Sequence, residues 1–183
     1  MEEELRLKRI GRHLSYKGSI MEIYKDDMLM PDGRVVQWDY FDHEGGSAVV
    51  PVLPDGRILM VRQYRNALDM FTLEIPAGAF DEKNEDPIIC AGRELEEETG
   101  YKSENIFHLM DMHSLPAFTN EKVTIFAATD LVKGRQKLDD QEFLNVETYA
   151  LDDLISMIYA GEITDSKTVC GLFAYKLWEK QKK

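Results

Sequence analysis

The densest concentration of chemically active side chains lies in residues 81–98, which hold eight acidic and two basic residues. Glu94, Glu97 and Glu98 are spaced by three and four residues, so a helix would place them on one face. Like charges at this spacing repel, and burial increases the cost. A divalent cation would offset the repulsion, and Mg²⁺ prefers carboxylates, water and substrate phosphates as ligands. The alternative is a solvated acidic face on which Arg93 pairs with Glu97.

The element that must position these carboxylates is a helix predicted over residues 87–99. Asp86 suits the N-cap, Pro87 suits the first helical position, and Gly100 suits the position just past the end. The arc of this helix beside the glutamates is apolar and carries Ile88, Ala91 and Leu95. We therefore expect the carboxylates to lie at the edge of the hydrophobic core rather than opposite it.

Around this helix, residue periodicity predicts an α/β domain with a mixed sheet, preceded by a strand-rich arm. Strands are expected over residues 16–24, 34–41, 48–53, 57–64, 106–113, 122–128 and 143–149. Proline–glycine turns separate the first two strands at Met30-Pro-Asp-Gly33 and the next two, as a hairpin, at Pro54-Asp-Gly56. Further helices are expected over residues 151–159 and from about residue 165 onwards. The last helix has a predicted buried stripe of Val169, Leu172, Phe173 and Leu177.

Composition limits the classes of protein to which the chain can belong. Its 183 residues, 44% of them hydrophobic and 31% charged, suit one globular domain with an arm. The net charge of −12 argues against a nucleic acid or an anionic membrane as partner. No apolar run approaches the roughly 18 residues of a membrane span, and we expect no signal peptide. Cys90 and Cys170 do not form a spaced framework, so we expect reduced thiols and a cytoplasmic protein.

The sequence around the acidic helix resembles the Nudix box. It reads Gly78-Ala-Phe-Asp-Glu-Lys-Asn-Glu85, then seven residues, then Arg93-Glu-Leu-Glu-Glu-Glu-Thr-Gly-Tyr101, with one residue more than usual between Gly78 and Glu85. The resemblance implies a Nudix fold, in which helices enclose a mixed β-sheet. It assigns residues 43–183 to a Nudix hydrolase domain and residues 1–42 to a small N-terminal β-strand arm.

The same resemblance implies hydrolysis of a nucleoside diphosphate linked to another group, with Mg²⁺ as cofactor and Mn²⁺ as a substitute. Matched position by position, the metal ligands are Glu94, Glu98, Glu97 and the backbone carbonyl of Ala77. Arg93 and Glu85 match a structural pair that braces the helix against the preceding loop. We also count Glu97 and Arg93 among the catalytic residues.

Outside the box, nearly the whole chain resembles the ADP-ribose pyrophosphatase group. The matching segments are Arg62-Gln-Tyr-Arg65, Leu73-Glu-Ile-Pro-Ala-Gly78, Leu115-Pro-Ala-Phe-Thr-Asn-Glu121 and Gly161-Glu-Ile-Thr-Asp-Ser-Lys-Thr168. This implies cleavage of ADP-ribose to AMP and ribose 5-phosphate. The expected substrate-binding residues are Trp38, Arg62, Arg65, Glu74, Phe118 and Glu121, with Trp38 stacking on adenine and the arginines reaching phosphate.

In this group the general base tends to be a glutamate in a loop ahead of a late strand. The matching stretch is residues 134–143, in which Glu142 is the best-placed candidate and Asp139 and Asp140 are rivals. A solvated acidic loop is the alternative for each of the three.

Two other functions stay open at this point. A nucleotide-sugar hydrolase of the GDP-mannose type would share the architecture and differ in its base and sugar pockets. A non-catalytic nucleotide sensor would bind without turnover, but it has no need for three crowded carboxylates. For the arm, a few strands without a helix cannot bury enough apolar surface alone. We therefore expect a homodimer formed through the arm, with Trp38 at or near the adenine pocket.

Overall fold

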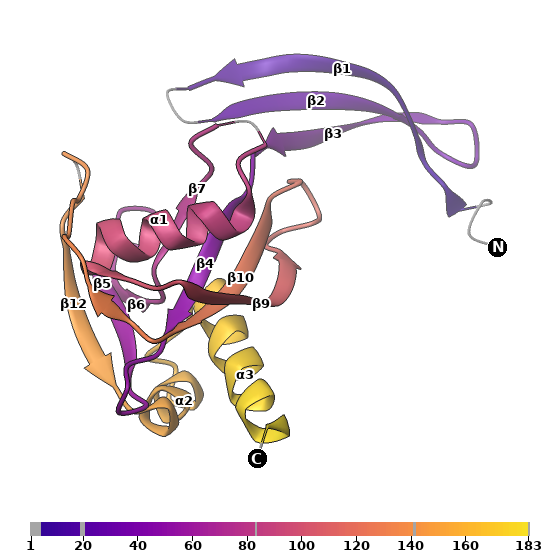
Figure 1. The fold of residues 1–183 in the computed structure, drawn as a ribbon. Coiled ribbons are helices and arrows are strands. Elements are labelled where there is room, and N and C mark those ends of the chain that lie inside the picture. The colour runs from indigo at the N-terminus through magenta and orange to yellow at the C-terminus, as the bar shows by residue number, and fades with distance from the viewer. Residues whose placement is uncertain (1–4, 19–20, 83, 141, 183) are drawn as a thin grey trace. The chain divides into compact units, whose positions relative to one another are not determined.

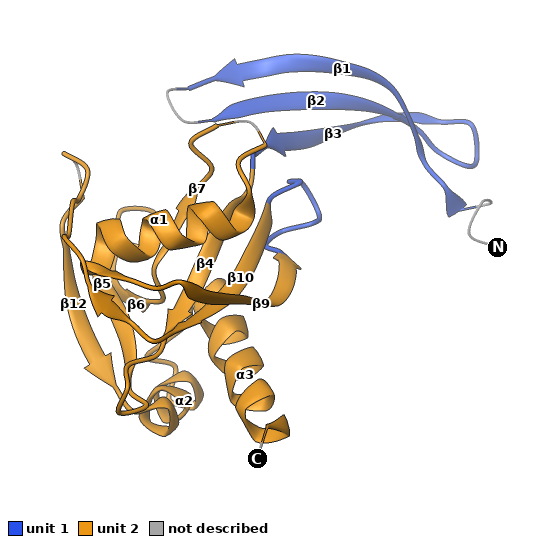
Figure 2. Cartoon of the chain, viewed as in Figure 1, with its two compact units in different colours: residues 1–44, 113–121 blue, residues 45–112, 122–183 orange. Residues whose placement is uncertain are grey.

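Residues 5–18, 21–82, 84–140 and 142–182 are described by this computed structural model. They fall into two units, coloured separately in Figure 2. Unit 1 comprises residues 1–44 and 113–121, and unit 2 comprises residues 45–112 and 122–183. The division predicted at residue 42 did not assign residues 113–121 to the arm. In the sequence, that loop stands between two strands of unit 2. The order of the elements along the chain therefore does not reveal that the loop belongs with the arm.

Unit 1 is built on an antiparallel sheet of β1 (Lys8–Lys17), β2 (Glu22–Leu29) and β3 (Val35–Asp42), paired in that order (Figure 1). The predicted turn before β3 is confirmed, because Gly33 has a φ of +86° and its N–H donates to the Met30 carbonyl. The strand predicted over residues 16–24 is wrong. Gly18 donates its N–H to the Met21 carbonyl across a turn, and residues 19 and 20 lie outside the described residues.

The loop of residues 113–121 belongs to unit 1 through contacts with the end of β3. The Phe41 N–H donates to the Phe118 carbonyl at 2.7 Å, and Phe41 forms a parallel bridge with Thr119. The Asn120 side chain accepts from the His43 N–H at 2.9 Å and donates to Asp42 at 3.1 Å. These contacts attach the loop to the arm.

In its described residues, unit 2 contains two larger sheets and a short strand pair. The strand orders are β7-β4-β10-β9, β12-β5-β6 and β11-β8. β4 and β10 are parallel, whereas β4 with β7, β5 with β6 and β5 with β12 are antiparallel, which confirms the mixed sheet. The strands are β4 (Gly46–Pro51), β5 (Ile58–Arg65), β6 (Met70–Glu74), β7 (Ala77–Ala79), β8 (Tyr101–Lys102), β9 (Asn105–His113), β10 (Lys122–Thr129), β11 (Val132–Lys133) and β12 (Leu144–Tyr149).

The hairpin predicted at Pro54-Asp-Gly56 is only partly right. The turn forms, with the Gly56 N–H donating to the Leu53 carbonyl. The strands on either side, β4 and β5, join different sheets, although Val52 and Ile58 form an isolated bridge. Turn chemistry is local, whereas the choice of sheet depends on distant partners.

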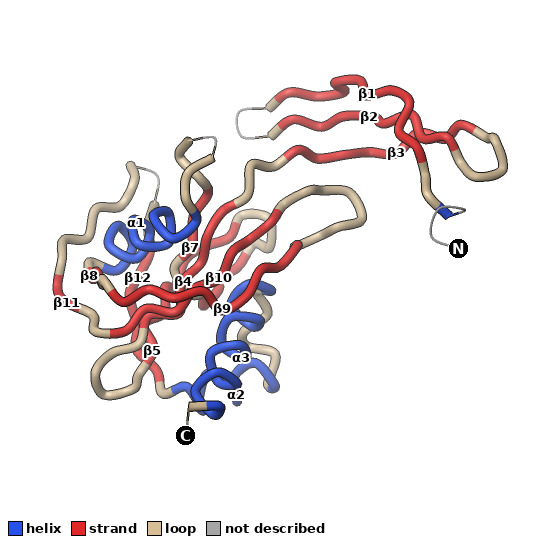
Figure 3. Tube along the Cα trace, turned by 45° about the vertical axis from the view of Figure 1, so that its right-hand side comes forward, coloured by secondary structure: helices blue, strands red, loops and turns tan. Residues whose placement is uncertain are grey.

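Helices cover both faces of the unit 2 strands, as Figure 3 shows. They are α1 (Pro87–Thr99), α2 (Leu151–Tyr159) and α3 (Ser166–Gln181). Side chains of β4 alternate between the two faces: Val49 packs with Ala91 and Leu95 of α1, whereas Ala48 and Val50 pack in a separate cluster with Leu154 of α2 and Leu172 of α3. This arrangement confirms the predicted sheet between helices.

The predicted buried stripe of α3 is displaced by about one residue. Thr168, Gly171, Leu172 and Tyr175 are buried, whereas Leu177 is 60% exposed. Thr168 at the start of the helix lies on the buried face, where it forms hydrogen bonds. The periodicity of apolar residues does not reveal these bonds, because threonine is polar. None of the helices in the described part of the chain is both long enough and apolar enough to cross a membrane.

Candidate functional site

α1 has the predicted bounds and caps, and it sets the position of the candidate metal ligands. The Asp86 carboxylate accepts from the Ile88 N–H at 3.1 Å, and Gly100 ends the helix in the left-handed conformation. Glu94 and Glu98 are buried, with 8% and 3% of their surface exposed. The expectation that these carboxylates lie at the edge of the core is confirmed for Glu94 and Glu98, whereas Glu97 is only partly buried and Ile88, predicted to face the core, is 36% exposed.

β7 brings its backbone against the same carboxylates. This strand pairs with β4, and the Ala77 N–H donates to Oε2 of Glu98 at 3.2 Å. Gly78 lies directly against the carboxylate of Glu94. The segment predicted to lend a backbone carbonyl to a metal therefore meets both buried glutamates.

Burial makes ionisation of these two carboxyl groups costly. The pKa of Glu94 is raised from 4.5 to about 7, chiefly by burial and further by the charges of Glu97 and Glu142, against the opposing effect of Arg93. The pKa of Glu98 is raised to about 8 by burial, by Glu94 and by Glu142. Among the described residues, Arg93 and Lys167 only partly offset the cost of burying these two carboxylates in their ionised form.

Arg93 interacts with several acidic side chains on and beside α1. It donates hydrogen bonds to Glu94 at 2.6 Å and to Glu97 at 3.1 Å. It also forms ion pairs with Asp81 at 3.1 Å and with Glu85 at 3.4 Å. The predicted brace between Arg93 and Glu85 is present, and so is the pairing with Glu97 expected for a solvated face. The extra-long loop before the helix includes Lys83, which lies outside the described residues.

The donor set fits a hard divalent cation that keeps part of its water shell. Within the described ranges, no group of three or more His, Cys, Asp or Glu side chains forms a ready metal cage. Glu94 and Glu98 nevertheless offer buried carboxylate oxygens whose charge is incompletely compensated. Mg²⁺ typically binds through one or two carboxylates plus waters and substrate phosphates, so a pair of carboxylates suits it better than a full cage would.

Glu74, predicted to touch substrate, is instead enclosed by protein. It ends β6 with 1% of its surface exposed, and Arg65 donates two hydrogen bonds to it at 2.6 and 2.7 Å. Thr72 and Lys167 donate to the same carboxylate. Burial alone would raise the pKa of Glu74, but these partners outweigh it and hold the pKa at about 2. Glu74 therefore stays ionised and holds two cations.

The two predicted phosphate-binding arginines have different surroundings. Arg65 keeps 42% of its side chain exposed, and its charge interacts with that of Glu98. Arg62 lies on β5 and donates to two side chains of β12, to Glu147 at 2.6 Å and to the Tyr149 hydroxyl at 3.3 Å. Arg65 is thus placed near the buried carboxylates, with part of its guanidinium free.

The loop with the candidate base is anchored to the end of α1. The Gln136 amide donates to the Glu98 carbonyl at 2.7 Å, and the Lys137 N–H donates to the Glu97 carbonyl at 3.0 Å. The charge of Glu142 raises the pKa of both Glu94 and Glu98, so Glu142 lies within electrostatic range of both.

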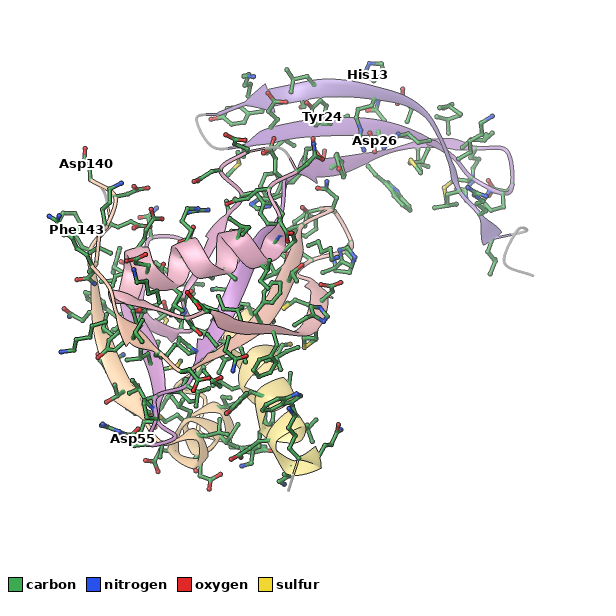
Figure 4. All side chains as sticks on the ribbon, in the orientation of Figure 1. His13, Tyr24, Asp26, Asp55, Asp140 and Phe143 are labelled. Atoms are coloured by element: carbon green, nitrogen blue, oxygen red, sulfur yellow. The ribbon has the colours of Figure 1, made fainter. Side chains whose placement is uncertain are left out.

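The far part of this loop borders an open hollow. The hollow has a volume of about 540 Å³ and is lined by Lys137, Leu138, Asp139, Asp140 and Glu142. Figure 4 shows Asp140 at the tip of the loop ahead of β12. The Asp139 N–H donates to the Glu142 carboxylate at 3.2 Å, so the candidate base and one of its rivals share a turn.

The remaining predicted substrate residues belong to unit 1. Trp38 lies on β3 and is 45% exposed, opposite Asp26 of β2, which is labelled in Figure 4. Phe118 is 46% exposed, and Glu121 accepts from the Ser114 hydroxyl. Trp38 and Phe118 therefore have aromatic surface free for a ligand or a second chain.

Sequence reasoning missed Lys167 as a residue of this region. In the sequence it stands only within the segment that enters the last helix, yet its ammonium group reaches Glu74, which is 93 residues away in the chain. Its charge also opposes the rise in the pKa of Glu98. The acidic neighbour Asp165 is a visible helix cap, but nothing in local spacing points to Glu74.

Comparison with known proteins adds an independent line of evidence. Residues 43–170 match the family model described as NUDIX domain. The chain is 33% identical over 179 residues to an ADP-ribose pyrophosphatase of Bacillus subtilis (strain 168), covering 97% of this chain and 96% of the relative. It is 35% identical over 174 residues to a methanol dehydrogenase activator of Bacillus methanolicus, covering 94% of each.

More distant similarities extend the comparison. A GDP-mannose pyrophosphatase of Yersinia enterocolitica is 29% identical over 160 residues, covering 80% of this chain and 82% of the relative. A crystal structure of an ADP compounds hydrolase superposes with a TM-score of 0.86 at 20% identity, covering 97% of this chain and 96% of the other. At that identity the superposition supports the fold alone.

Proposed function

Because the chain belongs to the Nudix hydrolase family, we propose that it hydrolyses the pyrophosphate bond of ADP-ribose. Water is added across this bond, and the products are AMP and ribose 5-phosphate. The observation that carries the proposal is the pair of buried carboxylates, Glu94 and Glu98, enclosed by α1 and the Ala77–Gly78 backbone. The relative named ADP-ribose pyrophosphatase, which matches almost end to end, supports the choice of substrate.

Nudix hydrolases generally use divalent metal ions, and we propose Mg²⁺ for this chain, with Mn²⁺ as a substitute. Glu94 and Glu98 would hold it, with Glu97 and the Ala77 carbonyl as further ligands. A bound divalent cation supplies polarisation of the phosphate oxygens and a lower pKa for the attacking water. Arg93 orients Glu94 and Glu97 through its hydrogen bonds.

Proton transfer and phosphate binding fall to residues beyond α1. Glu142 accepts the proton of the attacking water, and the support for this role is that its charge acts on both Glu94 and Glu98 from an exposed position on the loop. Arg65 binds a substrate phosphate through the part of its guanidinium that Glu74 leaves free. Glu74 supports Arg65 rather than touching substrate. Arg62 is a second phosphate contact only if it leaves Glu147.

Unit 1 supplies the adenine contacts and the dimer interface in this proposal. Trp38 stacks on adenine, while Phe118 and Glu121 complete the substrate contacts. Support for a homodimer comes from the large apolar side chains that the arm strands leave exposed, which include Ile10, Leu14, Tyr16, Val35 and Trp38. Cys90 and Cys170 are free thiols, which supports a reducing compartment, the cytoplasm.

A nucleotide-sugar hydrolase is the second candidate, favoured by the similarity to GDP-mannose pyrophosphatase. It uses the same carboxylates and differs only in the groups that contact the base and sugar. The relative named methanol dehydrogenase activator does not alter the proposal, because its name states an effect on another enzyme rather than a reaction.

A substrate panel tests the proposal directly. The purified protein would be incubated with ADP-ribose, GDP-mannose, NADH and diadenosine polyphosphates, each with Mg²⁺ and with a chelator. We expect the highest kcat/KM for ADP-ribose and no turnover with the chelator. Preferential cleavage of GDP-mannose would establish the second candidate. Tight binding without turnover of any compound would indicate a nucleotide sensor.

A further inference from the structure

The end of β6 is joined to the start of α3 by side chains that do not contact substrate in the proposed reaction. Lys167, the second residue of α3, donates to the buried Glu74 carboxylate and lies 3.0 Å from Asp165. Only 16% of the Lys167 side chain is exposed. Its ammonium group is therefore committed to internal carboxylates rather than to solvent.

Thr168 makes the second connection at the same place. Its fully buried hydroxyl accepts from the Ile75 N–H at 3.0 Å and donates to Asp165 at 2.6 Å. Asp165 in turn caps α3 by accepting from the Thr168 N–H at 2.9 Å. Glu74 at the end of β6 and Ile75 directly after it are thus attached to the first turn of α3, and every buried polar side chain described in this connection has a partner.

The attached segment continues straight into the proposed metal site. Pro76 follows Ile75, and its carbonyl accepts from the Val49 N–H at 2.9 Å. Ala77 then donates to Glu98, and Gly78 lies against Glu94. Any shift of Glu74 or Ile75 must therefore be absorbed within the short stretch that contacts both carboxylates.

We propose that Lys167, with Thr168, is a positioning residue of the metal site: it fixes the Glu74–Gly78 segment so that Ala77 and Gly78 meet Glu98 and Glu94. This inference rests on the proposed function, since it concerns the same divalent-cation site. Neighbours that orient metal ligands commonly affect metal affinity by about 10- to 100-fold. Lys167 acts through the backbone of this segment and does not itself contact substrate.

The test measures metal affinity rather than activity. Titration calorimetry with MnCl₂ would be run on metal-free wild type, Lys167→Met and Thr168→Val, with circular dichroism to confirm folding. Lys176→Met is the matched control, because it removes another α3 ion pair, at 2.8 Å to Asp152 of α2, away from Glu74. We expect about 10-fold weaker Mn²⁺ binding in Lys167→Met and Thr168→Val, and a change below about 2-fold in Lys176→Met.

Other results of this titration would contradict either the positioning role of Lys167 or the proposed function. Wild-type Mn²⁺ affinity in both folded variants would overturn the proposal and leave Lys167 a purely structural residue. Weakening in Lys167→Met alone would also overturn it, because loss of either attachment should shift the Glu74–Gly78 segment. Wild type binding Mn²⁺ no better than Glu98→Gln would instead count against the proposed function.

Discussion

A Cβ atom added at Gly78 would lie 1.9 Å from Oε1 of Glu94. Two non-bonded atoms cannot lie that close together, so the carboxylate can occupy its position only beside a residue without a side chain. Glu94 has little room to retreat, since it is buried and Arg93 holds the same Oε1 at 2.6 Å. The glycine is therefore part of the geometry of the site and not only of the loop.

Gly78→Ala should displace the Glu94 carboxylate or the β7 backbone and lower kcat/KM for ADP-ribose by about 10²-fold or more. Gly92→Ala is the matched control on α1, where the added Cβ would lie 3.3 Å from the Ile106 side chain and alanine favours the helix. Steady-state kinetics and thermal unfolding would be measured for both. A Gly78→Ala enzyme with wild-type kcat/KM would show that Glu94 does not need its observed position.

Glu142→Gln should lower kcat by about 10²-fold with little change in KM, because a general base acts mainly in the transition state. Asp139→Asn and Asp140→Asn are the comparisons on the same loop. A larger loss in either of them would transfer the role to that residue. If none of the three variants loses activity, water activation does not involve this loop.

The metal-free protein should lose stability as the pH rises from 4.5 towards 8. Both Glu94 and Glu98 have an ordinary value of 4.5, but their folded-state pKa values are about 7 and about 8. Between these limits the folded state keeps protons that the unfolded state has lost, so raising the pH favours unfolding.

Urea unfolding in the presence of a chelator, at several pH values, would measure the slope of the free energy of unfolding against pH. Glu98→Gln should flatten it, because glutamine does not titrate, and added Mg²⁺ should oppose it by binding the ionised carboxylates. Identical slopes in wild type and Glu98→Gln would mean that Glu98 has an ordinary pKa in the folded protein.

Trp38→Ala should raise KM for ADP-ribose more than it lowers kcat, since stacking on adenine contributes mostly uniform binding. The arm is also expected to form a homodimer, which light scattering at micromolar concentration would detect. A wild-type monomer would count against the dimer. An unchanged KM in Trp38→Ala would count against the adenine contact.

Local signals in the sequence were sufficient for much of unit 2. Asp86, Pro87 and Gly100 mark the ends of α1 by side-chain capping and backbone conformation, and the helix has the predicted bounds. The spacing of the glutamates then determines which of them face the core. Such features depend on residues within a few positions of one another, so sequence inspection can find them.

Features that depend on distant partners were harder to predict. β1 has few apolar residues in alternation, so its pairing with β2 was missed, and the short β7 and β8 carry too few residues for any period. The partners of Arg62 and Glu74 come from β12 and α3, 85 and 93 residues away. No local pattern indicates that Arg62 meets Glu147 or that Lys167 meets Glu74.

The most direct test of the central claim is a time course with ADP-ribose that quantifies both products for wild type, Glu98→Gln and Glu96→Gln. Glu96 is the control on the same helix, and glutamine there keeps an oxygen for the Arg135 N–H. We predict equal amounts of AMP and ribose 5-phosphate from wild type with Mg²⁺, a loss of about 10²–10⁴-fold in kcat for Glu98→Gln, and a change below about 3-fold for Glu96→Gln. Near-normal kcat for Glu98→Gln at saturating Mg²⁺, or no AMP from wild type, would contradict the account.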